Sequence, residues 1–211
     1  MREVTRERRT FVKQTTQIKN KIHAILIKRG IKIPSVTLCK GTLLWLKDKL
    51  PDEKIMMHYL DLLEYHKQKL DEIDKTVSDK ADKNNNAKLL MTIPGIGTTR
   101  SLDIVAEIGE IDRFSTADKL CSYAGLVPGI KQSGNTLRFG KLIKQASKNL
   151  KGTLVEASWN LVRTKENNLL QEFYKRLVKK KGKQKAICAT ARKLGCVIHA
   201  MLTNQEEFRY S

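Results

Sequence analysis

Apolar residues recur every seven positions between residues 56 and 77, and this heptad repeat constrains the fold more than any other feature. One position of the repeat holds Met56, Leu63, Leu70 and Val77, and the other holds Tyr59, His66 and Ile73. A helix with this period keeps one apolar seam turned toward a partner helix along its length. We therefore predict a long helix over residues 54–82 that packs against a second helix, with His58 and His66 in the seam or at its edge.

The partner helix is predicted over residues 4–29. Its apolar residues recur at helical spacings between Arg-rich and Lys-rich flanks, at Val4, Phe11, Ile18, Ile22 and Ile25. Gly30 stops this run, and a short apolar helix follows over residues 43–50. We predict that the two long helices form an antiparallel hairpin, a coiled coil that also holds the protein in a homo-oligomer.

Residues 85–211 are predicted to form a second, compact helical domain. The polar run 82–87 is the expected linker, so the coiled-coil region covers residues 1–84. Helical periodicity predicts helices over residues 86–92, 98–109, 116–123, 142–164, 167–180 and 183–203. The sequence contains no strand-like alternation of any length and no apolar run long enough to cross a membrane. The predicted fold class is therefore all-α, a helical hairpin followed by a compact helical domain.

The charge of the chain indicates a polyanionic partner. Lys and Arg outnumber Asp and Glu by 41 to 22, which gives a formal net charge of +19. Residues 131–200 alone hold 17 Lys and Arg against three Glu. Such an excess favours nucleic acid over a membrane surface, because no basic amphipathic helix stands alone at a terminus. Aromatic residues make up only 6% of the chain, which disfavours a base-stacking platform.

The cysteines indicate the compartment. The four residues, Cys39, Cys121, Cys188 and Cys196, form no C-x-x-C pair. We predict reduced, buried thiols, no zinc site, and a cytoplasmic, nucleoid-associated protein. A signal peptide is not expected, because the first nine residues are charged and no apolar segment follows them directly.

The run Ile93-Pro-Gly-Ile-Gly97 resembles the turn of a helix–hairpin–helix, expected over residues 86–109. Two glycines flank one apolar residue, so the turn is tight and Ile96 plugs the space between the helices. The amides at the start of the second helix can then hold a DNA phosphate. The predicted DNA contacts here are Gly95, Gly97, Thr98, Thr99 and Arg100. Such turns also serve as plain packing units, which is the alternative.

Residues 125–144 are predicted to form a glycine-rich, basic loop with Ser133 near its centre. No carboxylate occurs between Asp118 and Glu156, and glycines let a sugar-phosphate backbone come close. The Ser133 hydroxyl can bind a phosphate oxygen, attack phosphorus, or simply belong to a turn. No His or carboxylate lies near it in the sequence to activate it. The cations that can stabilise phosphoryl charge instead are Arg138, Lys141 and Lys144.

Several segments together resemble one family, the DEDD-type insertion-sequence transposases related to the pilin invertase, also called the insertion-sequence one-ten group. They are residues 93–97, 113–115, 120–128, 133–134, 140, 173–177 and 181–194. The resemblance covers residues 88–203. The helices before it are similar to the coiled coil that lies between the family's two catalytic parts.

The resemblance implies a specific chemistry. In the family, an N-terminal ribonuclease-H-like domain supplies four acidic metal ligands, and the C-terminal domain supplies a serine that becomes covalently joined to DNA. Carried onto this sequence, the nucleophile is Ser133, and Gly134 lets the DNA backbone approach. Our own candidates for further DNA contacts are Arg138, Lys141, Lys144 and Lys148. A guide RNA is a further expected partner, and Mg²⁺ is expected only together with the acidic domain.

Two features differ from the family pattern. The acidic domain should precede the coiled coil, yet the sequence starts at the coiled coil. The family's Lys-x-Gly-Asn segment is here Lys144-Gln-Ala146-Ser147. Lys151 also stands where the family has a following Arg. An Arg would bind phosphate bidentately, and a Lys does not. We therefore expect a DNA-binding transposase or site-specific recombinase that is truncated and inactive alone. The alternatives are a non-catalytic nucleic-acid-binding remnant that pairs with an intact transposase, and an interaction protein whose heptad helix recruits a partner.

Overall fold

The computed structural model describes residues 1–35, 37–133, 136–165 and 168–209. Most of these residues are helical, which confirms the predicted fold class. The chain divides into two compact units, Glu3–Thr76 and Met1–Arg2 with Val77–Ser211. The predicted functional boundary after residue 84 stays a prediction. Among the described residues, no helix combines the length and the apolar character that crossing a bilayer requires.

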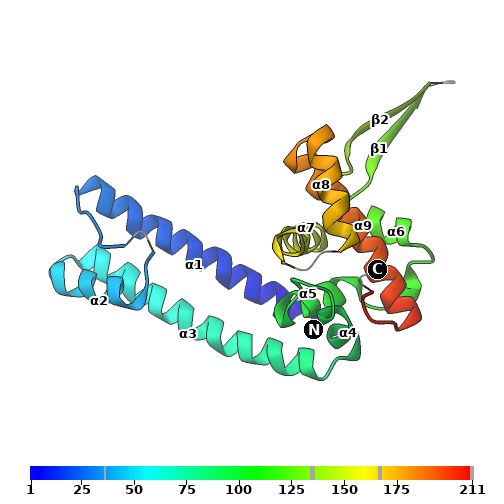
Figure 1. Ribbon diagram of the computed structural model, residues 1–211. Helices are drawn as coiled ribbons and strands as arrows, with labels where there is room; N and C mark the ends of the chain where they lie inside the picture. The colour runs from blue at the N-terminus through cyan, green and yellow to red at the C-terminus, as the bar shows by residue number, and fades with distance from the viewer. Residues whose placement is uncertain (36, 134–135, 166–167, 210–211) are drawn as a thin grey trace. The chain divides into compact units, whose positions relative to one another are not determined.

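Two long helices lie side by side and antiparallel in the first unit (Figure 1). They are α1 (Arg2–Lys28) and α3 (Lys54–Asp82), and the short α2 (Lys40–Lys49) packs beside them. The core of this unit contains Ile18, Ile22, Leu26, Leu38, Leu43, Leu46, Met56, Leu60 and Leu63. The three helices thus share one apolar core, and the predicted antiparallel helical hairpin is confirmed.

The heptad seam of α3 faces inward, as its period predicts. Leu63 is fully buried, and His66 is half-buried at the edge of the seam. The His66 ring packs against Phe11 of α1, with 5.3 Å between the ring centroids. Farther from this core, an ion pair joins Arg8 of α1 to Asp74 of α3. Side-chain contacts between the two helices therefore extend well beyond the apolar core.

Gly30 ends α1, as the sequence predicts. It takes a φ of +66°, and the amides of Gly30 and Ile31 donate to the carbonyls of Ile27 and Leu26 at 3.1 and 3.0 Å. This pair of bonds is a Schellman motif, which satisfies carbonyls at the helix end. Glycine suits the position because it adopts left-handed backbone conformations without steric strain.

Helix α9 (Lys183–Asn204) is the centre of the second unit. It packs against α4 (Asn85–Met91), α6 (Ala117–Tyr123), α7 (Lys148–Arg163) and α8 (Leu169–Lys181). Helix α5 (Thr98–Ile108) packs on α4 and α7, and a short 3-10 helix, Ile111–Arg113, precedes α6. Small residues of α9 permit close packing: a Cβ at Gly195 would lie 3.2 Å from the Cys121 sulfur.

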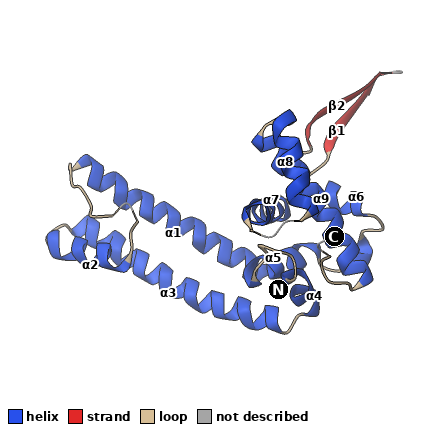
Figure 2. Cartoon of the chain, viewed as in Figure 1, coloured by secondary structure: helices blue, strands red, loops and turns tan. Residues whose placement is uncertain are grey.

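The segment predicted as a loop is a β-hairpin. Strands β1 (Pro128–Ser133) and β2 (Thr136–Leu142) pair antiparallel (Figure 2). The prediction that the chain contains no strand was therefore wrong, and α7 begins at residue 148 instead of 142. Glycines and lysines interrupt the apolar alternation here. The main remaining signal is the Gly-Asn pair between two short alternating runs, a sequence typical of a hairpin loop.

The prediction of four buried thiols was wrong for Cys39 and held in full for Cys121 alone. Cys121 is buried, and Cys188 and Cys196 are half-buried, but Cys39 is exposed. Cys39 stands before the first residue of α2, where the chain enters the helix from a loop. Loops run over protein surfaces, because a buried loop would carry backbone groups without hydrogen bonds. The apolar surroundings of Cys39 in the sequence therefore did not lead to burial of its thiol.

Replacing Leu63 by Ala tests the α1–α3 core. Leu63 is fully buried, so its truncation should lower the free energy of unfolding by about 2–5 kcal/mol. Urea denaturation followed by circular dichroism measures the change. The matched control is Leu44→Ala on α2, where the side chain is 59% exposed and the expected change is within about 0.5 kcal/mol. Equal losses in the two variants would contradict the assignment of the core.

Candidate nucleic-acid interface

Helices α4 and α5 are joined by a tight turn, as the helix–hairpin–helix resemblance predicts. Ile93 and Ile96 are buried, and the Ile96 amide donates to the Ile93 carbonyl at 3.1 Å. Gly95 takes a φ of +83° and lies against α7, where a Cβ would meet the Leu161 amide nitrogen at 2.9 Å. The Asn160 side-chain amide donates to the Gly95 carbonyl at 3.3 Å. Packing against α7 accounts for Gly95, and its predicted DNA contact stays a prediction.

The N-terminal end of α5 is open. Gly97 is exposed and caps the helix without a side-chain hydrogen bond, and a Cβ added there would meet nothing within 4 Å. Thr98 and Thr99 are half-buried in the first turn. The first amides of a helix lack partners within the helix and carry partial positive charge. This end of α5 can therefore receive a phosphate oxygen.

Arg100 lies in the same turn. Its terminal nitrogen is 4.0 Å from a carboxylate oxygen of Glu156 on α7, and its side chain is 34% exposed. Its buried Nε has no hydrogen-bond partner among the residues that the structure describes. A buried donor without an acceptor is uncommon in folded proteins. A phosphate held at the start of α5 can supply that acceptor.

The β1–β2 hairpin extends away from the helices of its unit (Figure 1), and Ser133 is the last residue of β1. It pairs with Thr136, and Lys131 pairs with Arg138. Because residues alternate between the two faces of a strand, these four positions share one face of the ladder. The other face holds the positions of Ile130, Gln132, Leu137 and Phe139. Gly134 and the side chains of residues 130–139 lie outside the described part of the chain.

The base of the hairpin is fixed between α6 and α7. The Ser147 amide donates to the Tyr123 carbonyl at 2.9 Å. Gly125 takes a φ of +68° and approaches Ala146 so closely that a Cβ would lie 2.5 Å from the Ala146 Cβ. Only glycine fits this position without a shift of the backbone. The three predicted lysines, Lys141, Lys144 and Lys148, are exposed at the end of β2, in the connection and at the start of α7.

A buried carboxylate connects the end of α5 to the start of α7. Glu107 is 1% exposed, and its oxygens accept hydrogen bonds from the Ser147 hydroxyl at 3.3 Å and the Asn149 amide at 3.1 Å. Ser147 also caps α7 by accepting from the Leu150 amide at 3.3 Å. Sequence analysis did not single out Glu107. Its spacing of four from Asp103 within an apolar helix was the available signal.

The predicted DNA contacts other than Gly134 and Arg138 lie in two groups. The start of α5 adjoins Asn160 near the end of α7, whereas the end of α5 adjoins Ser147 just before α7. The two helices are therefore antiparallel, and the α5 turn and the hairpin base lie at opposite ends of the pair. The 11 residues of α5 span about 16 Å, at 1.5 Å per residue.

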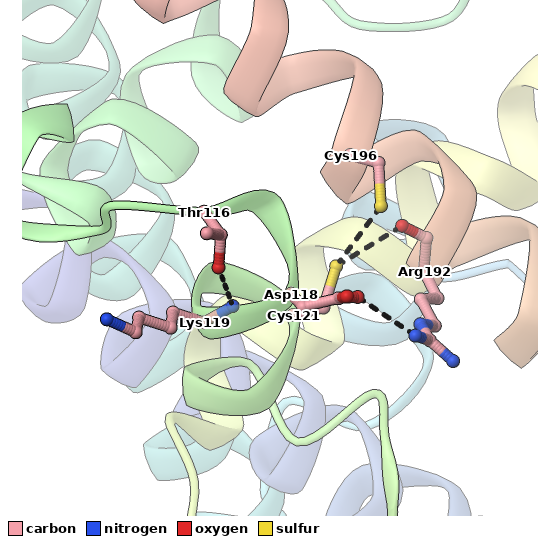
Figure 3. A network of polar contacts seen from close by, with 6 residues as sticks. All are labelled: Thr116, Asp118, Lys119, Cys121, Arg192 and Cys196. Carbon is pink, nitrogen blue, oxygen red and sulfur yellow. Dashed lines mark hydrogen bonds and ion pairs between the residues drawn. The ribbon is translucent and has the colours of Figure 1, made fainter.

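Polar contacts hold α6 against α9 (Figure 3). The Arg192 guanidinium is 2.9 Å from Asp118, and the Cys121 thiol donates to the Arg192 carbonyl at 3.4 Å and lies 3.8 Å from the Cys196 sulfur. Burial raises the pKa of the Cys121 thiol to about 12. The thiol therefore stays protonated at neutral pH and is a poor nucleophile. Its place in the network is structural, since it helps to seat the helix that leads into the hairpin.

Comparison with known proteins gives one consistent group of relatives. Residues 87–175 match the family model described as "Transposase IS116/IS110/IS902 family". The transposase for insertion sequence element IS1111A of Coxiella burnetii is 30% identical over 131 residues, 61% of this chain and 36% of the relative. The pilin gene-inverting protein of Moraxella bovis is 34% identical over 127 residues, 59% of this chain and 39% of the relative.

A third relative aligns with nearly the whole chain. The transposase for insertion sequence element IS1328 of Yersinia enterocolitica is 22% identical over 209 residues, 96% of this chain and 63% of the relative. The chain thus spans between 36% and 63% of the length of these three relatives. The matched residues include the α4–α5 turn, the serine hairpin and α7. Residues 87–175 thus match the IS116/IS110/IS902 family of transposases.

Proposed function

We propose that this chain is the DNA-binding, serine-bearing part of a transposase or site-specific recombinase of an insertion sequence. One observation carries the proposal: Ser133 ends a strand within the segment that matches the transposase family, at a position that shares one face of the ladder with the positions of Lys131 and Arg138. A hydroxyl beside two cationic positions suits a phosphodiester, because the cations stabilise charge that develops on the phosphoryl oxygens.

In the proposed reaction the Ser133 oxygen attacks a DNA phosphorus. A new O–P bond forms, and the bond between that phosphorus and one deoxyribose oxygen breaks. The displaced oxygen takes up a proton, and the serine proton passes to a base. The product is a protein–DNA phosphodiester, which a second DNA hydroxyl can attack to release the serine. The step therefore exchanges one phosphodiester for another.

Activation of the serine is assigned to a partner domain. The described residues hold no group of three or more His, Cys, Asp or Glu that could bind a metal ion. The described part of the chain therefore offers no metal-binding cluster, and the proposed reaction uses no metal ligand from it. The resemblance to the family implies that Mg²⁺ belongs with an acidic domain.

The two contact groups would hold one DNA duplex at separate points. The open amides of α5 would bind one phosphate through Gly97, Thr98 and Thr99, and the lysines at the hairpin base would bind others. A distance of about 16 Å between the groups corresponds to roughly five steps of 3.4 Å along a strand. Binding at both groups would orient the duplex relative to the hairpin that carries Ser133.

A second candidate function needs no catalysis. The net charge of +19 and the α1–α3 pair are sufficient for a nucleic-acid-binding protein that pairs with an intact transposase. Homo-oligomerisation through α1 and α3 and binding of a guide RNA remain predictions under either function. The two functions differ in whether Ser133 forms a bond with DNA.

Gly97→Asp tests the helical turn separately from the chemistry. Aspartate is a good N-cap, and a side chain at this position meets no neighbour, so the melting temperature should be unchanged or raised. Its carboxylate would repel a phosphate at the α5 amides. We expect duplex DNA affinity to fall about tenfold, or ~1.4 kcal/mol. Fluorescence anisotropy measures the affinity, and Gly97→Ala is the control that should bind like the original protein.

Ser133→Ala tests the nucleophile. The chain is combined with labelled duplex DNA, Mg²⁺ and the acidic domain of the same insertion sequence supplied in trans. A protein–DNA species that survives denaturing electrophoresis should form with the original chain. It should disappear completely with Ser133→Ala, because a phosphate ester needs the hydroxyl. The DNA affinity of Ser133→Ala should stay within about twofold of the original. An adduct that persists in Ser133→Ala would refute the role. Binding without any adduct would favour the second candidate.

A further inference from the structure

We propose that the elbow between α8 and α9 is a second phosphate-binding surface, which holds the backbone of a nucleic-acid double helix. The inference rests on the proposed function in that nucleic acid is the partner. The basic elbow consists of Lys175, Arg176, Lys179, Lys180, Lys181, Lys183 and Lys185. The family match ends at residue 175, so nearly all of the elbow lies beyond the matched segment.

The fold gathers these cations from two helices. Helix α8 ends at Lys181 and α9 begins at Lys183, with Gly182 between them at a φ of +75°. The two helices pack against each other, so the chain reverses direction within one residue. The cations of the last turns of α8 and the first turn of α9 therefore lie together at one end of the helix pair.

The cations of α8 share one side of the helix. Lys175, Arg176, Lys179 and Lys180 are exposed, and their spacing of one and four residues places them on one face. Leu170 is buried on the other side. In α9, Lys183 and Lys185 are exposed as well, as is Lys181 at the end of α8. All seven side chains can therefore reach a polyanion without any change in the fold.

The elbow cations have no ion-pair partners among the described residues, whereas several cations elsewhere do. In the first unit, Lys47 lies 3.0 Å from Glu64 and Lys69 lies 2.8 Å from Glu72. No Asp or Glu occurs in the sequence between Glu172 and Glu206. The positive charge of the elbow is therefore not neutralised within the described fold.

A surface hollow adjoins the unpaired cations of the elbow at Arg176. Leu169, Glu172, Phe173, Arg176 and Lys193 line it, with a volume of about 240 Å³. Arg176 and Lys193 both lie over the Phe173 ring, 5.6 and 4.8 Å from its centroid. Glu172 offsets part of the charge there. Beyond the hollow the elbow presents only lysines among its charged side chains, so we assign the phosphate contacts to residues 179–185.

Lys179, Lys180 and Lys181 complement the macrodipole at the end of α8, but other features of the elbow work against the folded state. Lys175 and Lys179 are like charges four residues apart, as are Arg176 and Lys180, and such pairs repel each other. The first turn of α9 contains no acidic residue, and its cap makes no side-chain hydrogen bond. Lys183 and Lys185 therefore oppose the positive end of the helix macrodipole. A bound polyanion would relieve both effects.

The chemistry of the elbow selects the backbone and not the bases. Residues 179–185 contain five lysines and no aromatic side chain on which a base could stack. A lysine ammonium contacts phosphate as a point charge and carries no sequence information. The surface should therefore bind a double helix regardless of its sequence. Duplex DNA and duplex RNA share this chemistry, and experiment distinguishes them.

The test replaces Lys179, Lys180, Lys183 and Lys185 together by Gln in the full chain. Glutamine keeps the helix propensity and removes four charges. The slope of log K against log salt for duplex DNA should become shallower by about 3–4, because each lost phosphate contact accounts for about 0.9. Affinity should fall equally for unrelated DNA sequences. Circular dichroism checks that the helices remain.

A matched control separates local contacts from net charge. Lys13, Lys28, Lys54 and Lys75 are exposed in the first unit, and their replacement by Gln removes the same charge. The control should leave the slope within one unit of the original. An equal loss of slope in the control, or an unchanged slope in the elbow variant, overturns the inference.

The same measurement on duplex RNA identifies the source of the phosphate. A loss confined to one duplex assigns the elbow to that nucleic acid, and a loss on both assigns it to any double helix. The Gly97→Asp variant distinguishes failure of the elbow inference from failure of the proposed function. If that variant binds weakly while the elbow variant binds normally, the elbow inference fails and the proposed function stands. If the original protein binds neither duplex, both fail.

Discussion

The buried carboxylate of Glu107 is the contact on which the arrangement of the second unit depends. A carboxylate removed from water is costly unless its oxygens accept hydrogen bonds. Ser147 and Asn149 supply those bonds from the start of α7. Because Ser147 also caps α7, the residue that begins the helix is the residue that satisfies the carboxylate. The position of α7 is therefore set by an electrostatic requirement as well as by apolar packing.

The position of α7, which Glu107 helps to set, fixes only the base of the serine hairpin. Gly125 and Ala146 bring the two connections of the hairpin into contact beside α6 and α7. Ser133 stands at the other end of β1, about 17 Å from Pro128 at 3.3 Å per residue. A rigid base with a distant serine lets the hairpin meet a large partner without disturbing the helical core. The structure thereby keeps the elements that pack separate from the element proposed to react.

Sequence alone predicted the parts of the fold that local periodicity controls. The inward seam of α3, the end of α1 at Gly30 and the turn around Ile96 each depend on residues close in the chain. The hairpin was missed because its strands alternate for only a few residues. Glu107 was missed because its partners lie 40 residues away, and no local pattern encodes that distance. The separation of the predicted DNA contacts could not be read from the sequence for the same reason, since it follows from the antiparallel packing of α5 and α7.

The distribution of ion pairs shows where the net charge of the chain can act. Some cations of the first unit are paired with carboxylates, as Lys47 of α2 is with Asp61 and Glu64 of α3, and the fields of such pairs are largely cancelled at a distance. Pairing also occurs in the second unit where helices must be held, as at Arg192 and Asp118. The lysines of the α8–α9 elbow have no ion-pair partners among the described residues. Those that end α8 complement its macrodipole, but Lys183 and Lys185 oppose the positive end of α9. Unpaired charge that opposes its own helix is explained most simply by an external polyanion.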